Sequence, residues 1–186
     1  INSIGVASHL HPDFGEDQTY GIPFTVVDSV QAKVPITFTA YGDESDAGPY
    51  PIPETAAIEA GSDNHVLVLN KSSCVLYELY NAVNHPHDTG WSADSGAIWD
   101  FSTNALRPAG WTSADAAGLP ILPGLVRYHE VKTKKIKHAI RFTAPATQNG
   151  WIHPATHQAG SANLDLPPMG LRVRLKASYD ISSFTG

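Results

Sequence analysis

The sequence contains a single cysteine, Cys74, in 186 residues, so no disulfide can form within the chain. Its stability must therefore come from a hydrophobic core, and a chain of this length is long enough to bury one. Cys74 is followed by Val75 and Leu76, and this apolar context predicts a buried, unreactive thiol. No apolar run approaches the ~20 residues that span a bilayer, so we expect no membrane partner.

Charge is scarce as well, because charged residues make up 16% of the chain and the net charge is −6. Binding of nucleic acid requires a positive surface that neutralises phosphates, so we expect no nucleic-acid partner. Positive charge is concentrated only in a short run that is typical of a solvated turn, at Lys132, Lys134, Lys135 and Lys137. The chain also lacks a P-loop, a dinucleotide fingerprint and a G-x-S-x-G motif. We therefore expect no cofactor and no serine nucleophile.

Turn residues are abundant, with 15 glycines and 14 prolines, and they separate short β-rich segments. In residues 34–41, Val34, Ile36 and Phe38 alternate with threonines, which is typical of a half-buried strand. Further strands are predicted at 65–69, 74–80, 124–131, 136–143 and 171–179. Such a pattern predicts a mainly β protein, a β-sandwich or jelly-roll-like single domain over residues 1–186 with long loops.

The clearest local prediction is a hairpin whose turn is Asn70–Ser73. A symmetric turn there pairs Leu69 with Cys74 and places His65 opposite Glu78. Residues directly opposite each other in an antiparallel pair share a face, so His65 and Glu78 would be in contact. A three-residue or bulged loop would change this register.

A second informative stretch, residues 91–130, combines aromatic, acidic and turn residues. Trp91, Trp99, Trp111 and Arg107 lie in it and are candidate substrate-binding residues. Pyranose rings stack on flat apolar surfaces, so these tryptophans could serve as sugar platforms. The alternative is that they are buried anchors, which is the commoner use of tryptophan.

Hydrolysis of a glycosidic bond requires two carboxyl groups, one of them kept protonated by its surroundings. Glu78 is the best candidate acid, since burial among Tyr77, Leu79 and Tyr80 would raise its pKa. Asp115, close to Trp111, is the best candidate partner, and Asp94 and Asp100 are reserves. His65 joins the catalytic set as the expected neighbour of Glu78. Equally, Glu78 could be a structural acid that His65 satisfies.

Other chemistries are less well supported by the residue pattern. His153 and His157 have a spacing that suits metal binding on a helix, but the intervening Pro154 disfavours that helix. The acidic loop 43–46 lacks the ligand spacing of a calcium loop. We therefore expect no metal site. A lyase would need a base and a cation, for which the candidates are Tyr128, His138 and Arg141.

Several strings of the sequence, including HLHPDFG, YGDESDAGPYPIP and ALRPAGWTSADAAGLPILPGLVRY, resemble a family of secreted proteins from soil bacteria and fungi. The resemblance covers nearly the whole chain and implies an extracellular location, but it supplies no mechanism. Family members continue past the equivalent of Gly186 into a helix and an Asp-Asn-Gly segment. Together with a first residue that is not Met, this leads us to expect that the chain is part of a longer protein that has been processed.

These observations favour two functions. The first is a secreted, polysaccharide-active hydrolase that uses Glu78 and Asp115 with the tryptophans as sugar platforms. The second is a non-catalytic carbohydrate-binding or extracellular structural protein, in which the same tryptophans bind sugar or simply pack. Catalysis requires Glu78 and a second carboxylate to meet in a cleft, whereas binding requires only exposed aromatic rings.

Overall fold

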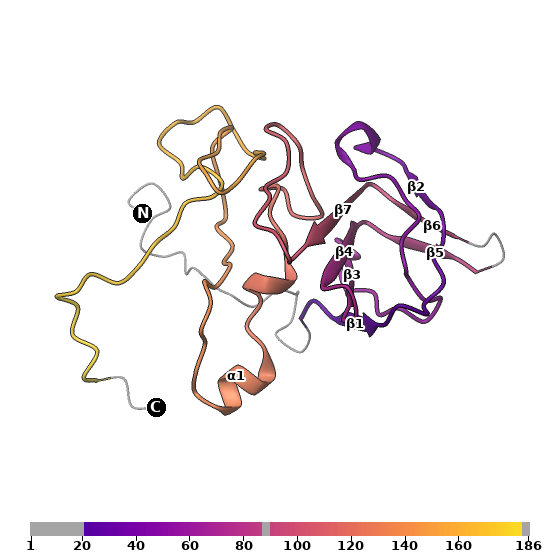
Figure 1. Ribbon diagram of the computed structural model, residues 1–186. Helices are drawn as coiled ribbons and strands as arrows, with labels where there is room; N and C mark the ends of the chain where they lie inside the picture. The colour runs from indigo at the N-terminus through magenta and orange to yellow at the C-terminus, as the bar shows by residue number, and fades with distance from the viewer. Residues whose placement is uncertain (1–20, 87–89, 184–186) are drawn as a thin grey trace.

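The computed structural model describes residues 21–86 and 90–183, and its strands form two mixed sheets (Figure 1). The strands are β1 (Phe24–Val27), β2 (Ile36–Phe38), β3 (Val66–Asn70), β4 (Val75–Tyr80), β5 (Val83–His85), β6 (Gly90–Ala93) and β7 (Ser95–Asp100). One sheet has the order β1-β3-β4-β7 and the other β2-β6-β5. The helical segments of the described residues are η1 (Gly42–Glu44), η2 (Leu122–Gly124) and α1 (Tyr128–Lys132). The predicted mainly β, sandwich-like class is confirmed.

The central strands of the four-stranded sheet, β3 and β4, are buried on both faces, which explains their nearly continuous apolar sequence. Successive side chains of a strand point to opposite faces. Val66 and Val68 accordingly belong to one core cluster, while Leu67 belongs to a second cluster on the other side. The sheet is therefore the middle layer of the molecule.

One face of this sheet packs against the three-stranded sheet. Trp91 and Ala93 of β6 lie in the shared core, and Ile36 and Phe38 of β2 pack against it. The predicted alternation in residues 34–41 is thus confirmed, although the strand itself is shorter. Val34 lies outside it and forms an isolated bridge with Tyr50.

The other face is covered by a loop segment rather than by a sheet. Ala114, Ile121, Leu122 and Leu125 of this segment pack in one cluster with Trp99 of β7. We call residues 101–125 the loop layer. A loop buried in this way brings backbone N–H and C=O groups with it, and these need hydrogen-bond partners.

The predicted hairpin exists, but its register differs by two residues. Asn70 pairs with Val75 and Leu67 pairs with Glu78, so the expected direct His65–Glu78 pair is wrong. The reason is that Asn70 ends β3, and its side-chain Oδ1 accepts hydrogen bonds from the amides of the turn. Cys74 consequently lies in the turn, where it has a φ of 56° and is exposed, so the predicted buried thiol is also wrong.

The strands predicted at 124–131, 136–143 and 171–179 are not present in the described chain. Glu130 instead caps α1 by accepting the Arg127 amide at 2.9 Å and binds His138 at 3.0 Å. After η2 the chain runs away from the two sheets (Figure 1). No helix in the described residues is long and apolar enough to span a bilayer.

Gly96 on β7 provides a test of how the two sheets fit together. A Cβ atom added at Gly96 would lie 2.8 Å from Cε1 of Phe38 and 2.9 Å from Cδ2 of Leu79. We expect Gly96→Ala to lower the free energy of unfolding by about 1–3 kcal/mol, measured by urea denaturation, because overpacked cores are strained. Gly21→Ala is the control, since a Cβ there meets nothing within 4 Å. Equal stability of the two variants would contradict this packing.

Candidate functional site

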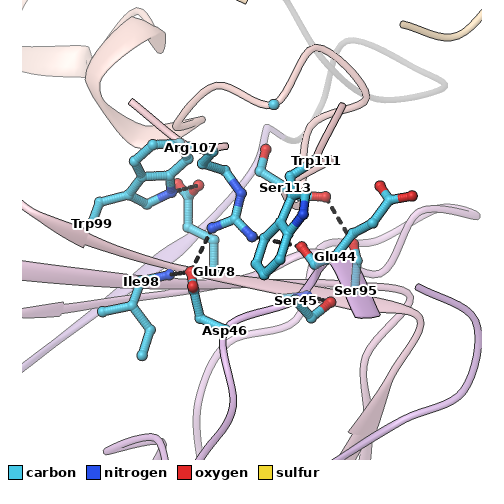
Figure 2. Close-up of polar contacts among 12 residues, drawn as sticks. Glu44, Ser45, Asp46, Glu78, Ser95, Ile98, Trp99, Arg107, Trp111 and Ser113 are labelled. Atoms are coloured by element: carbon cyan, nitrogen blue, oxygen red, sulfur yellow. Dashed lines mark hydrogen bonds and ion pairs between the residues drawn. The ribbon is translucent and has the colours of Figure 1, made fainter. Parts of the chain in front are cut away.

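Arg107 lies at the junction between the loop layer and the sheet (Figure 2), and its side chain is almost fully buried. Its Nε donates to the carbonyl of Thr112 at 2.6 Å. One terminal nitrogen donates to the carboxylate of Asp46 at 2.5 Å, and the other donates to the carbonyl of Glu44 at 2.7 Å. A single guanidinium thus connects the loop layer with the segment that follows β2.

Two tryptophan rings flank this guanidinium. Its central carbon lies 5.7 Å from the ring centroid of Trp99 and 5.5 Å from that of Trp111. A cation within about 6 Å of an aromatic centroid is attracted by the negative charge of the ring face. Arg107 therefore provides a fixed contact for the Trp111 ring, because its own hydrogen bonds hold the guanidinium in place.

The segment bearing Asp46 also covers the edge of the sheet at β7. Asp46 Oδ2 accepts the Ile98 amide at 2.8 Å, and the Asp46 amide donates to the Gly96 carbonyl at 3.1 Å. Ser45 Oγ accepts the Gly96 amide at 3.1 Å. The amide and carbonyl of Gly96 and the amide of Ile98, which point outward from the edge strand, thereby have partners. Asp46 and the Glu44 carbonyl both take part in this junction.

Glu78 on β4 is completely buried, and its carboxylate is the main polar partner of the loop layer. Oε1 accepts the amides of Ile121 and Leu122, each at 3.0 Å. Oε2 accepts the indole N–H of Trp99 at 3.1 Å (Figure 2). The alternative of a structural acid fits this geometry, but the donors are these three N–H groups and not His65.

Burial raises the pKa of Glu78 to about 7, although the hydrogen bonds from Leu122 and Ile121 and the charge of Arg141 act in the opposite direction. Desolvation disfavours the ionised carboxylate more than these donors favour it. A general acid must also contact the substrate, and a side chain with 0% exposure cannot do so in this conformation. The raised pKa follows from the anchoring position of Glu78.

Asp115, the predicted catalytic partner, lies in the loop layer and keeps some exposure. Its carboxylate binds Arg141 at 3.2 Å, and its backbone carbonyl accepts the Gly118 amide at 2.8 Å. Arg141 and His138, candidates for a lyase, are thus joined to Asp115 and Glu130 respectively, while Tyr128 is exposed. His138 and Arg141 therefore contact two different carboxylates, Glu130 and Asp115, rather than a common one.

His65, predicted to assist Glu78, lies on the same face of the sheet but has other partners. Its Nδ1 is 2.5 Å from Glu59 Oε2, and its Nε2 is 3.0 Å from the Ala114 carbonyl. Burial lowers the pKa of His65, but the hydrogen bond and charge of Glu59 outweigh this, so the pKa is raised. Glu59 was not identified from the sequence. The only indication there is that an acidic residue precedes His65, in the predicted strand 65–69, by six positions.

The three tryptophans of the 91–130 stretch have different environments. Trp91 is 3% exposed and Trp99 is 7% exposed, so both pack in the core, as the alternative interpretation expected. Trp111 is only partly buried. The structure thus leaves a single ring of the three for contact with a ligand.

Two polar side chains, those of Glu44 and His157, contact the backbone of residues close to Trp111 in the chain. Glu44 Oε2 accepts the Thr112 amide at 2.9 Å and lies 3.8 Å from His157 Nε2. His157 Nδ1 faces the Ala116 carbonyl at 2.8 Å, so Nδ1 carries the proton that is donated. Glu44 and His157 remain partly exposed. We refer to Glu44, Trp111 and His157 as the Trp111 surface.

Comparison of the chain with known protein families, curated proteins and solved structures gives no match. Interpretation of the site therefore depends on its own geometry.

The buried position of Glu78 predicts an unusual pH dependence of stability. A folded-state pKa of about 7, above the ordinary 4.5, means that the folded protein binds this proton more tightly than the unfolded chain does. The contribution of Glu78 to the free energy of unfolding is therefore complete below pH 4.5 and is lost as the pH rises through 7.

Glu78→Gln should remove this pH dependence, as measured by urea denaturation at pH 5 and pH 8. It should also destabilise the protein at pH 5 by about 1–3 kcal/mol, because the amide nitrogen, unlike the hydroxyl oxygen of the protonated acid, cannot accept a hydrogen bond from the N–H group it faces. Glu54→Gln, at an exposed acid, is the control. The same pH slope in wild type and Glu78→Gln would show that Glu78 does not titrate in this range.

Arg107→Lys tests the junction. Lysine keeps the charge but cannot reach Thr112, Asp46 and Glu44 together, so we expect a loss of about 2 kcal/mol or more in thermal or urea unfolding. Arg127→Lys is the control, since the Arg127 side chain is far more exposed than that of Arg107 and hydrogen-bonds to the Glu130 carboxylate. If Arg107→Lys is no more destabilising than Arg127→Lys, the three hydrogen bonds do not hold the junction.

Proposed function

We propose that this chain is a secreted, non-catalytic carbohydrate-binding protein that holds a sugar ring against Trp111. The observation that carries the proposal is the partial exposure of Trp111 beside Glu44 and His157. Sugars combine apolar ring faces with hydroxyl groups, so a binding site pairs an aromatic ring with side chains that form hydrogen bonds. An extracellular location is supported by the resemblance to secreted proteins.

Rigid placement of the ring supports the proposal further. Arg107 is held by three hydrogen bonds and lies against Trp111. Thr156 Oγ1 also donates to the Trp111 carbonyl at 3.0 Å. A side chain that is already ordered loses little conformational entropy on binding, which favours affinity.

Hydrolysis by Glu78 and Asp115 is less well supported. Both oxygens of Glu78 are engaged by N–H groups inside the core, and Asp115 is paired with Arg141. For hydrolysis the loop layer would have to open and release Ile121 and Leu122 from Glu78. Binding at the Trp111 surface needs no such change.

The test is retention on insoluble plant, fungal and bacterial polysaccharides, measured for wild type, Trp111→Ala and Trp151→Ala. Trp151 is a matched control because it is an exposed tryptophan outside the Trp111 surface. On the polysaccharide that retains the wild type, we expect Trp111→Ala to bind at least about tenfold more weakly, which corresponds to about 1.4 kcal/mol. Circular dichroism verifies that the variant is folded.

Release of reducing ends from the same polysaccharides separates the two functions. The proposal predicts no release by wild type. Release that disappears in both Glu78→Gln and Asp115→Asn would establish the hydrolase and contradict the proposal. Retention that is equal in Trp111→Ala and wild type would contradict the assignment of the site.

A further inference from the structure

Glu59, Asp63 and His65 form a second cluster of ionisable groups, separate from the residues of the Trp111 surface. Their ligand-type atoms, one from each residue, all lie within 4.8 Å of one another. Glu59 and His65 are buried, whereas Asp63 is exposed. The cluster is thus open to solvent on one side and enclosed by protein on the other.

The hydrogen-bond geometry of His65 fixes which ring nitrogen is protonated. The Ala114 carbonyl can only accept, so the Nε2 that lies 3.0 Å from it carries a proton. In the neutral imidazole Nδ1 is then a bare lone pair, and it faces the Glu59 carboxylate, another acceptor, at 2.5 Å. Two acceptors this close require a cation between them, either a proton or a metal ion.

The same arrangement is typical of histidines that bind metals. A metal-binding histidine nearly always donates its second ring N–H to a carbonyl or carboxylate, which orients the ring. Here the Ala114 carbonyl of the loop layer provides that acceptor, and Nδ1 points toward Glu59 and Asp63. The orienting contact and the ligand atoms thus come from different parts of the chain.

The segment carrying these residues is held at both ends by backbone hydrogen bonds. The Glu59 amide donates to the His65 carbonyl at 2.9 Å, and the Asn81 amide donates to the Asp63 carbonyl at 2.8 Å. Two ligands of a tetrahedral zinc ion lie about 3.3 Å apart, given bonds of about 2.0–2.1 Å. Glu59 Oε2 and His65 Nδ1 would therefore move apart by less than about 1 Å, and the exposed Asp63 side chain would move inward.

We propose that Glu59, Asp63 and His65 bind a divalent transition-metal ion of the zinc type. One imidazole and two carboxylates suit such an ion, whereas calcium and magnesium prefer sites made of more oxygen ligands. Three protein ligands leave a fourth position of a tetrahedral ion for water or for an oxygen of a ligand. The site is independent of carbohydrate binding by Trp111.

The direct test is isothermal titration of chelator-treated full-length chain with ZnCl₂, in wild type, Asp63→Asn and Asp43→Asn. Asp63→Asn removes an exposed ligand and leaves the buried pair intact, so the variant should fold. We expect one zinc ion per wild-type chain and at least tenfold weaker binding in Asp63→Asn. Asp43→Asn, which changes another exposed aspartate, should bind as the wild type does.

A second measurement locates the ion. Nitrogen NMR of the imidazoles should show that zinc shifts Nδ1 of His65 while Nε2 stays protonated. Titration with MgCl₂ should give no binding in the same concentration range. The proposal is overturned if zinc does not bind, if Asp63→Asn binds as tightly as wild type, or if His65 is unaffected. If zinc does not bind, or if His65 is unaffected, the cation between His65 and Glu59 is a proton.

Discussion

The fold depends on a carboxylate in the core, that of Glu78, which accepts the amides of Ile121 and Leu122. A β-sheet face is usually covered by another sheet or by helices, whose backbone groups are already paired. Here a loop covers it, and a buried loop must find partners for its own amides. Glu78 supplies them from the sheet side, so the leucine and isoleucine side chains of the loop can pack against β3 and β4.

Trp99 connects this anchor with the second buried charge. Its indole N–H binds Glu78, and its ring lies beside the guanidinium of Arg107. Arg107 in turn joins Asp46 and the backbone of the loop layer. Trp99 thus contacts both Glu78 and Arg107, and Arg107 in turn contacts the ring of Trp111. Trp111, which is partly exposed, thus belongs to the loop layer that Glu78 and Arg107 anchor.

The fold class and the strands β2, β3 and β4 could be predicted from the sequence, because burial leaves a periodic or apolar pattern in them. Val34, Ile36 and Phe38 pack against the core on one face as their alternation indicated. The register of the hairpin could not be predicted, because it depends on a single hydrogen-bonding group, the Asn70 side chain, which accepts the amides of the turn. The conformation of residues 171–179 could not be predicted either. Apolar and basic residues alternate there as in a strand, but the segment pairs with no strand in the described structure.

The candidate site was predictable only in part. Glu78 is distinctive because an acid within an apolar strand must be either satisfied or reactive, and the sequence cannot decide between the two. Its partners come from Ile121 and Leu122, more than forty residues away, and are backbone groups that every residue carries. The same limit applies to Arg107, whose acceptors include two carbonyls. Because every residue has a backbone carbonyl and nearly every residue a backbone amide, hydrogen bonds to these groups cannot be recognised from the residue types in the sequence.

The most direct test of the anchoring role of Glu78 is native-state hydrogen exchange of the Ile121 and Leu122 amides, followed by NMR in the wild-type protein. If the Glu78 carboxylate holds the loop layer on the sheet, both amides should exchange only through openings whose free energy approaches that of global unfolding. Exchange as fast as that of an exposed loop amide such as Ala105 would contradict the account. The loop layer would then open easily, and Glu78 would be within reach of a substrate.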